Sequence, residues 1–284
     1  MTDPLPPEIS QPSDIRRPAS IIDVHTHVFP QNVMEKIWAY FDRHHWPIRY
    51  RSAEAERTAV LEERVEAYTT LCYAHRPGMA DWLNQYVLDY AATHPKAIPT
   101  GTFHPDDEDV LAYVQRGIER GLRGFKVHLE VQRFDPADSR LAGVYGLLTE
   151  AGCVVTVHTA GLPLAGPWTG PEPFERMLRM APRMPIIVAH IGGDEHEDYW
   201  RMAQDYPLYF DTAMIGVDYE GFGLLGEEMQ AHIRAHPDRF LFGSDFPSIP
   251  YEWEHQVDVV RSWNLGAEGE GLVFAENARR LFGV

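Results

Sequence analysis

Short β-branched segments, each followed by a polar stretch that favours helix, recur eight times along this chain, and this alternation most constrains its fold. The expected strands are 20–27, 67–73, 97–103, 122–129, 153–158, 185–191, 207–212 and 239–243. Helices are expected at 107–120, 139–151, 197–206, 227–235 and 276–282, most of them ending at or just before glycine or proline. Eight strand–helix units predict a single-domain (β/α)8 TIM barrel of the α/β class.

The main alternative fold is a doubly wound open sheet. That alternative is weakened because no expected strand is followed by a glycine-rich phosphate loop of the dinucleotide or P-loop type. The charge balance, −17 over 284 residues, disfavours nucleic acid and anionic membranes as partners, since their phosphates would repel the chain. No segment approaches the roughly 18 apolar residues of a membrane helix.

The expected barrel occupies residues 20–284 and follows an N-terminal arm, residues 1–19. The arm is polar and rich in proline and lacks the apolar segment of a secretory signal, which predicts a cytoplasmic domain. Such barrels are often homodimers, and the arm could embrace a second subunit. Cys72 and Cys153 lie in apolar runs, so a disulfide framework is not expected.

Residues 30–54 are too many for an ordinary loop between a strand and its helix. They are rich in aromatic residues and histidines, and we interpret them as an insertion near the barrel mouth, with a helix over 31–44. The first barrel helix is then expected at 54–68.

Histidines and one aspartate collect where the expected strands end, which is the end of a barrel that carries catalytic groups. The first strand ends in His25-Thr26-His27, and its two-residue period points both histidines to the same side. The fifth strand ends at His158, the sixth at His190, and Asp245 follows the eighth. Each residue alone has a structural interpretation, but together they predict a site for zinc or a similar divalent ion, with room for water.

At these residues the chain resembles the amidohydrolase superfamily. The similar segments are 22–27 (IDVHTH), 156–158 (TVH), 188–193 (VAHIGG) and 243–247 (GSDFP). The closest branch is the amidohydrolase-related proteins that include aminocarboxymuconate-semialdehyde decarboxylase, and residues 276–282 are similar to the closing helix of that branch. The resemblance spans about residues 21–284. Its motifs are specific for the superfamily and not for a substrate.

The resemblance implies a role for each of these positions. His25, His27, His158 and Asp245 would bind one divalent ion, foremost zinc, with manganese and iron as alternatives. Asp245 would also take a proton from water. His190 would be a catalytic histidine that orients or activates the water or polarises the substrate. This agrees with the general chemistry of such ions, which bring the pKa of a bound water toward neutrality.

Lys126 has several interpretations. It lies on the expected fourth strand and faces the same way as His128, toward the barrel interior. Some branches of the superfamily carbamylate a lysine there and bridge two metals, whereas the resembled branch uses one. Otherwise Lys126 is a cation near the substrate, or a buried lysine paired with an acid such as Asp23.

Other polar residues after the strands are candidates for contact with substrate. Arg133 could hold a carboxylate in a bidentate pair, or it could form a loop salt bridge with Asp135 or Asp138. The full set of expected substrate-binding residues is Lys126, His128, Arg133, His75 and His104.

Four further features stay open at this stage. Trp168 and Phe174 could wall the pocket or pack their loop onto the barrel. Asp211 could lie at the mouth or form a turn. The acidic stretch 194–198 is most simply the charged start of a helix.

These observations predict a metal-dependent hydrolase that attacks an amide, lactone or ester-like bond of a small organic molecule. The alternative is a metal-dependent, nonoxidative decarboxylase of a small unsaturated or aromatic carboxylate, because both chemistries can use the same ligands. A third hypothesis, a non-catalytic barrel used for binding, is disfavoured by the complete ligand set. The acidic total does not exclude a carboxylate substrate, since much of the acid lies on expected helices and loops.

Overall fold

The computed structural model describes residue 18 and residues 20–160, 165–217 and 225–284. The predicted N-terminal arm, residues 1–19, lies almost wholly outside the described residues. Part of the loop after His158, residues 161–164, lies outside them as well. The arm and its part in a dimer therefore stay predictions.

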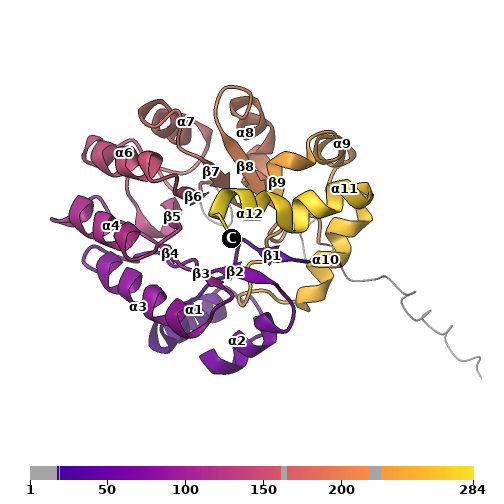
Figure 1. The fold of residues 1–284 in the computed structure, drawn as a ribbon, viewed down its shortest axis with the longest axis horizontal. Helices are drawn as coiled ribbons and strands as arrows, with labels where there is room; N and C mark the ends of the chain where they lie inside the picture. Colours follow the sequence, from indigo (N-terminus) through magenta and orange to yellow (C-terminus); the bar gives the residue numbers. More distant parts are fainter. Residues whose placement is uncertain (1–17, 19, 161–164, 218–224) are drawn as a thin grey trace, which may run out of the picture.

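Parallel strands form a ring at the centre of the molecule (Figure 1), in two sheets within which each strand pairs with the next one along the chain. One sheet holds β1 (Ile22–Asp23), β2 (Ala67–Thr69) and β3 (Ala97–Ile98). The other holds β4 (Thr100–Gly101), β5 (Gly124–His128), β6 (Val154–His158), β7 (Ile186–Val188), β8 (Leu208–Asp211) and β9 (Phe240–Leu241). The ring closes where Val24 N donates to Phe242 O at 2.9 Å and Thr26 pairs with Phe246.

The eight-stranded barrel is confirmed, with one difference in its third strand. The expected strand 97–103 is divided into β3 and β4 at Pro99. Proline has no N–H to donate to a neighbouring strand, so the ladder breaks at this residue. The two pieces still occupy one position in the ring, because β3 pairs with β2 and β4 pairs with β5.

Helices surround the ring of strands on its outside (Figure 1). None of the described helices is long and apolar enough to span a membrane. The α-helices are α1 (Gln31–Arg43), α2 (Glu54–Glu62), α3 (Ala80–Thr93), α4 (Val110–Glu119), α5 (Leu129–Gln132), α6 (Ala142–Glu150), α7 (Pro171–Met180), α8 (His196–Met202), α9 (Glu227–Ala235), α10 (Trp253–Ser262), α11 (Gly266–Gly271) and α12 (Asn277–Phe282). Short 3-10 segments cover Ser139–Leu141, Ala189–Glu195 and Pro237–Arg239, and a π-helical turn covers Leu272–Glu276.

Helix α4 illustrates how the sequence builds this outer layer. Its buried residues Val110, Tyr113, Val114 and Gly117 recur at the spacing of one helix face, so that face packs inward. The helix ends just before Gly121. The backbone φ of Gly121 is 112°, a value that residues other than glycine rarely adopt.

The segment after α1 packs against the chain that follows β9. Trp46 Nε1 donates to Ser248 O at 2.9 Å, and Arg49 N donates to Ile249 O at 3.0 Å. The expected helix 31–44 corresponds to α1. The first barrel helix is shorter than expected, since α2 ends at Glu62. The position of the insertion over the mouth stays a prediction.

The C-terminal helix closes one end of the barrel. In Figure 1, α12 lies across the centre of the ring. Phe282 and Ala278 pack there against residues of the strands, among them Ile22, Val154 and Leu241. The histidines therefore lie toward the opposite end, because Ile22 and Val154 begin β1 and β6, whereas His25 follows β1 and His158 ends β6.

We expect Phe282→Ala to lower the free energy of unfolding by about 3–5 kcal/mol, the usual range for truncating a buried phenylalanine. The Phe282 ring is 3% exposed and lies against Gly124, whose lack of a side chain makes room for it. Urea unfolding would measure the loss. Val284→Ala, at a residue 49% exposed, is the control. Equal stability of the two variants would contradict a closing role for α12.

Candidate metal centre

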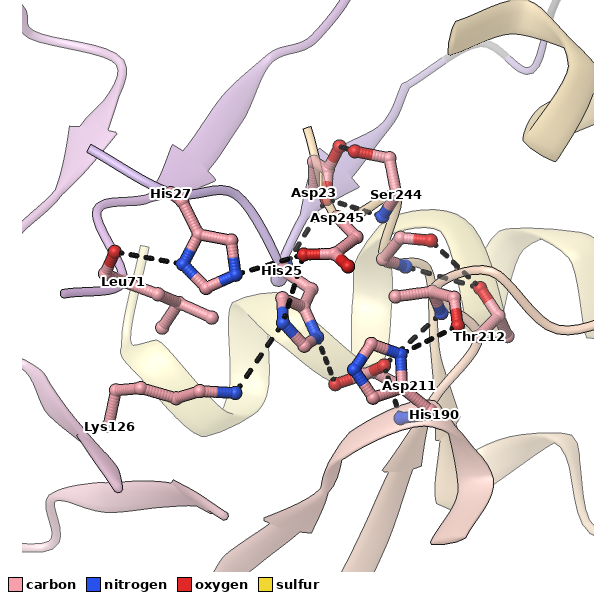
Figure 2. A network of polar contacts seen from close by, with 12 residues as sticks. Asp23, His25, His27, Leu71, Lys126, His190, Asp211, Thr212, Ser244 and Asp245 are labelled. Atoms are coloured by element: carbon pink, nitrogen blue, oxygen red, sulfur yellow. Dashed lines mark hydrogen bonds and ion pairs between the residues drawn. The ribbon is translucent and has the colours of Figure 1, made fainter. Parts of the chain in front are cut away.

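His25 and His27 follow β1 and present the same ring nitrogen to one point (Figure 2). The Nδ1 atom of His25 lies 2.9 Å from Asp211 Oδ2, and that of His27 lies 3.2 Å from Leu71 O. Both partners can only accept, so each Nδ1 carries a proton, and each Nε2 is the nitrogen that would offer its lone pair to a cation placed between the two rings. A carboxylate or carbonyl partner of this kind is what orients metal-binding histidines in general.

Asp245 brings a carboxylate to the same point. Its Oδ1 lies 2.9 Å from His27 Nε2 and 3.6 Å from His25 Nε2. The backbone of Asp245 is left-handed, with a φ of 68°, and its N–H donates to His25 O at 2.8 Å. This turn fixes the direction of the carboxylate toward the two rings.

These three residues fit a divalent cation. Their donor atoms all lie within 4.8 Å of one another. Bonds of about 2.0–2.2 Å to nitrogen and oxygen would hold neighbouring ligand atoms about 3–3.5 Å apart, close to the separations found here. Two imidazoles and a carboxylate suit zinc, manganese and iron, and three protein ligands leave a coordination position for substrate or water.

The charge state of the three residues suits the same role. Burial lowers the pKa of His25 well below its ordinary value, so this imidazole is neutral and able to bind an ion. Burial raises the pKa of Asp245, but the hydrogen bond from His27 and the electrostatic influence of the neighbouring imidazoles outweigh it, and the net pKa lies well below the usual range. Asp245 is therefore a carboxylate at neutral pH.

His190 lies beside this group on a strained turn after β7. Its φ of 54° is left-handed, and Ile191 shares that conformation with a φ of 56°. The His190 Nδ1 atom lies 2.9 Å from Ala213 O, so its Nε2 also keeps a lone pair. Its ring centroid is 4.7 Å from that of His25. Non-glycine residues in such conformations cluster at functional sites.

A second group of donor atoms, from His25, His190 and Asp211, also lies within 4.8 Å. In that group Asp211 contacts Nδ1 of His25, the nitrogen that donates to it. An ion cannot share that nitrogen with the proton. The group of His25, His27 and Asp245 is therefore the better candidate metal centre.

Lys126 places a buried ammonium next to the same group. It is fully buried on β5, and its Nζ lies 3.4 Å from His25 Nε2. Burial lowers the pKa of Lys126 to about 8, while Asp211 and Asp245 act in the opposite direction.

The pairing of Lys126 with Asp23 is wrong. Asp23 instead accepts hydrogen bonds from Ser244 Oγ at 2.6 Å and Trp253 Nε1 at 2.9 Å. Burial raises its pKa to about 7, although these hydrogen bonds act to lower it. Asp23 thus ties β1 to the turn that carries Asp245.

His158, the remaining expected ligand, lies next to this group. Its ring stacks on His128, with centroids 4.0 Å apart and planes 9° apart, and its centroid is 4.9 Å from that of His190. Among the described residues, no set of close donor atoms around the candidate centre includes His158. Its role as a ligand stays a prediction.

The other expected substrate-binding residues have different surroundings. His128 and His75 flank Tyr73, with ring centroids 5.0 and 5.1 Å away. Burial lowers the pKa of both histidines, well below the ordinary value in the case of His128. His104 is buried, and both its ring nitrogens contact the backbone, of Gln132 and Asp106, which favours a structural role.

Arg133 is exposed and left-handed, with a φ of 55°. The alternative of a loop salt bridge with Asp135 or Asp138 is wrong, because those acids pair with Arg176 and Arg140.

The aromatic residues of the loop after β6 divide into two cases. Phe174 is fully buried against Tyr199, with ring centroids 5.3 Å apart, so it packs α7 onto the barrel. Trp168 is half-buried. The acidic stretch 194–198 contributes Glu197 and Asp198 to the first turn of α8, in agreement with a charged helix start.

The family of the chain follows from comparison with known proteins. The model of the family described as Amidohydrolase matches residues 22–284, nearly the whole chain. The chain belongs to this amidohydrolase family. The match confirms the resemblance of the strand-end motifs, and it supports an enzyme. No curated protein matches the chain.

Solved structures share the fold of this amidohydrolase at low identity. An uncharacterised TIM-barrel protein from Bordetella bronchiseptica is 20% identical, with a TM-score of 0.70 and coverage of 93% of this chain and 98% of that one. A probable 2-pyrone-4,6-dicarboxylic acid hydrolase from Acinetobacter baumannii, with citric acid bound, is 13% identical. Its TM-score is 0.63, and the match covers 93% of this chain and 100% of that one. A 5-carboxyvanillate decarboxylase from Novosphingobium aromaticivorans, complexed with manganese and 4-hydroxy-3-methoxy-5-nitrobenzoic acid, is 16% identical. Its TM-score is 0.64, and the match covers 93% of this chain and 96% of that one.

Proposed function

We propose that this amidohydrolase is a metal-dependent hydrolase of an amide, lactone or ester-like bond in a small organic molecule. The observation that carries the proposal is the convergence of His25 Nε2, His27 Nε2 and Asp245 Oδ1 on one point. We further propose that these residues, with His158, hold one divalent ion. Zinc is the first choice for this ligand set, and manganese and iron are alternatives.

A divalent ion bound there would make a water molecule more acidic and polarise the scissile carbonyl. Asp245, a carboxylate at neutral pH, would accept the proton of that water. His190 would take that proton from Asp245 on Nε2, which has a lone pair because Ala213 O occupies Nδ1, and would then deliver it to the leaving group. Lys126 Nζ, beside His25, would lie near negative charge that develops on the substrate.

The second candidate is a metal-dependent decarboxylase of an unsaturated or aromatic carboxylate. It is favoured by the decarboxylase with manganese and a nitrobenzoic acid that shares this fold. The same surroundings would then bind the carboxylate through Lys126 and the histidines. The proton would be delivered to the carbon that loses carbon dioxide.

Product analysis separates the two chemistries. We expect the protein, loaded with zinc or manganese, to open lactones or cleave esters and amides in a panel that also contains aromatic acids labelled with ¹³C in the carboxyl group. Turnover should stop in chelator and return with the ion, because both proposed reactions depend on the ion. Labelled carbon dioxide without hydrolysis would favour the decarboxylase. Absence of both metal uptake and turnover would support the non-catalytic barrel.

A cytoplasmic location and a homodimer stay predictions. Size-exclusion chromatography with light scattering of the full chain tests the second of these.

A further inference from the structure

Asp211 lies at the end of β8, and its one carboxylate contacts both the ring of His25 and the backbone of His190 (Figure 2). It is fully buried. Its Oδ2 lies 2.9 Å from His25 Nδ1. Its Oδ1 accepts hydrogen bonds from the backbone N–H groups of His190 at 3.0 Å and Ala213 at 3.1 Å. One buried side chain thus joins the ends of three strands.

The Oδ2 contact decides which nitrogen of His25 is available. A carboxylate can only accept, so it requires the proton on Nδ1. The lone pair of His25 is then on Nε2, the atom that faces Lys126 Nζ at 3.4 Å and Asp245 Oδ1 at 3.6 Å. The ring can bind an ion at the candidate centre only in this tautomer.

The Oδ1 contact supports the strained turn at His190. A left-handed backbone at a non-glycine residue is sterically disfavoured and persists only where its surroundings hold it. The hydrogen bond from His190 N to Asp211 is one such restraint. The bond from Ala213 N fixes the carboxylate itself. Gly192 allows the chain to continue, since a side chain there would overlap the ring of Tyr199.

We propose that Asp211 is a positioning residue that sets the tautomer of His25 and the orientation of His190 at the same time. The inference rests on the proposed metal-dependent function, because it assigns a role in preparing that site. No sequence motif assigns this role to Asp211.

The substitution Asp211→Asn tests the proposal because an amide cannot satisfy both contacts. If its oxygen faces the two backbone N–H groups, its NH₂ group faces His25 Nδ1 and forces the proton onto Nε2. If the amide is reversed, its NH₂ group faces two buried N–H donors. The first arrangement leaves fewer buried donors unpaired and should be preferred.

Asp23→Asn is the matched control. Asp23 is also fully buried and also accepts several hydrogen bonds, from the backbone N–H of His25 and from Ser244 and Trp253. None of its partners is the side chain of a candidate ligand. It therefore reports the general cost of removing a buried carboxylate near this site.

We expect ¹⁵N NMR of the metal-free protein to show His25 protonated at Nδ1 in wild type and in Asp23→Asn, and at Nε2 in Asp211→Asn. Chelator competition should show metal binding weakened about 10- to 100-fold in Asp211→Asn, as for other residues that orient ligands. An unchanged His25 tautomer with unchanged affinity would overturn the inference. If Asp211→Asn does not fold, Asp211→Ser replaces it. A mixture of His25 tautomers then supports the role, and a single Nδ1–H form overturns it.

The experiment also separates this inference from the proposed function. A folded wild-type protein that takes up no divalent ion would overturn the proposed function. The tautomer measurement uses metal-free protein, so it would still decide whether Asp211 sets the state of His25.

Discussion

Asp245→Asn should lose its metal ion and its turnover together. The substitution keeps the size of the side chain and removes the charge that offsets the cation. Asparagine also tolerates the left-handed backbone at this position, where φ is 68°, so the turn is not strained further. Removal of the carboxylate leaves His25 and His27 without the oxygen that lies 3.6 and 2.9 Å from their Nε2 atoms.

We expect metal affinity to fall by more than about 100-fold, the upper end for residues that only orient ligands. Elemental analysis of protein purified without chelator, followed by chelator competition, measures the change. The control is Asp194→Asn, an exposed carboxylate in the acidic stretch after His190. Both variants should unfold at similar urea concentrations. Full metal content in Asp245→Asn, or loss of metal in Asp194→Asn, would place the ion elsewhere.

The parts of this centre that follow from the sequence are those set by local periodicity. The alternation of strands and helices places the residues at strand ends on one side of a barrel. From this rule, His25, His27 and Asp245 are predicted to lie together in one metal site. The same rule applies to Asp211, which ends β8. A lone aspartate at a strand end has several uses, so its role was not evident before its contacts were known.

The remaining features depend on contacts between residues far apart in the sequence. Asp23 was one alternative partner for Lys126, but Ser244 and Trp253, more than 200 residues away in the chain, occupy its oxygens. Arg176 and Arg140 similarly take the acids expected for Arg133. Periodicity predicts which face of an element a side chain occupies. It does not predict which of several nearby donors pairs with a given acceptor in the folded protein.

Backbone strain is a second feature that the sequence does not reveal. Gly192 and Gly193 indicate a turn after β7, but the left-handed residues begin earlier, at His190. The strain at His190 is held by the hydrogen bonds to Asp211 and Ala213, both from the neighbouring strand and its following turn. This turn presents Nε2 of His190 beside the candidate centre.

His190→Asn should nearly abolish turnover and leave metal content unchanged. Asparagine accepts a left-handed backbone, so this substitution removes the imidazole with less strain than alanine would introduce at a φ of 54°. His190 has Nδ1 bound to Ala213 O, and the ion is expected between His25, His27 and Asp245. The imidazole would therefore move a proton and not hold the ion.

We expect kcat to fall by about 10²- to 10⁴-fold, the range for loss of a general acid or base. Metal analysis and steady-state kinetics on the same preparation measure both quantities. His232→Asn, on α9 away from the candidate centre, is the control and should keep both. Heavy metal loss in His190→Asn would instead make His190 a ligand, as in the alternative group with His25 and Asp211. Loss of turnover with retained metal would assign it the proton transfer, because the ligand set would then be intact.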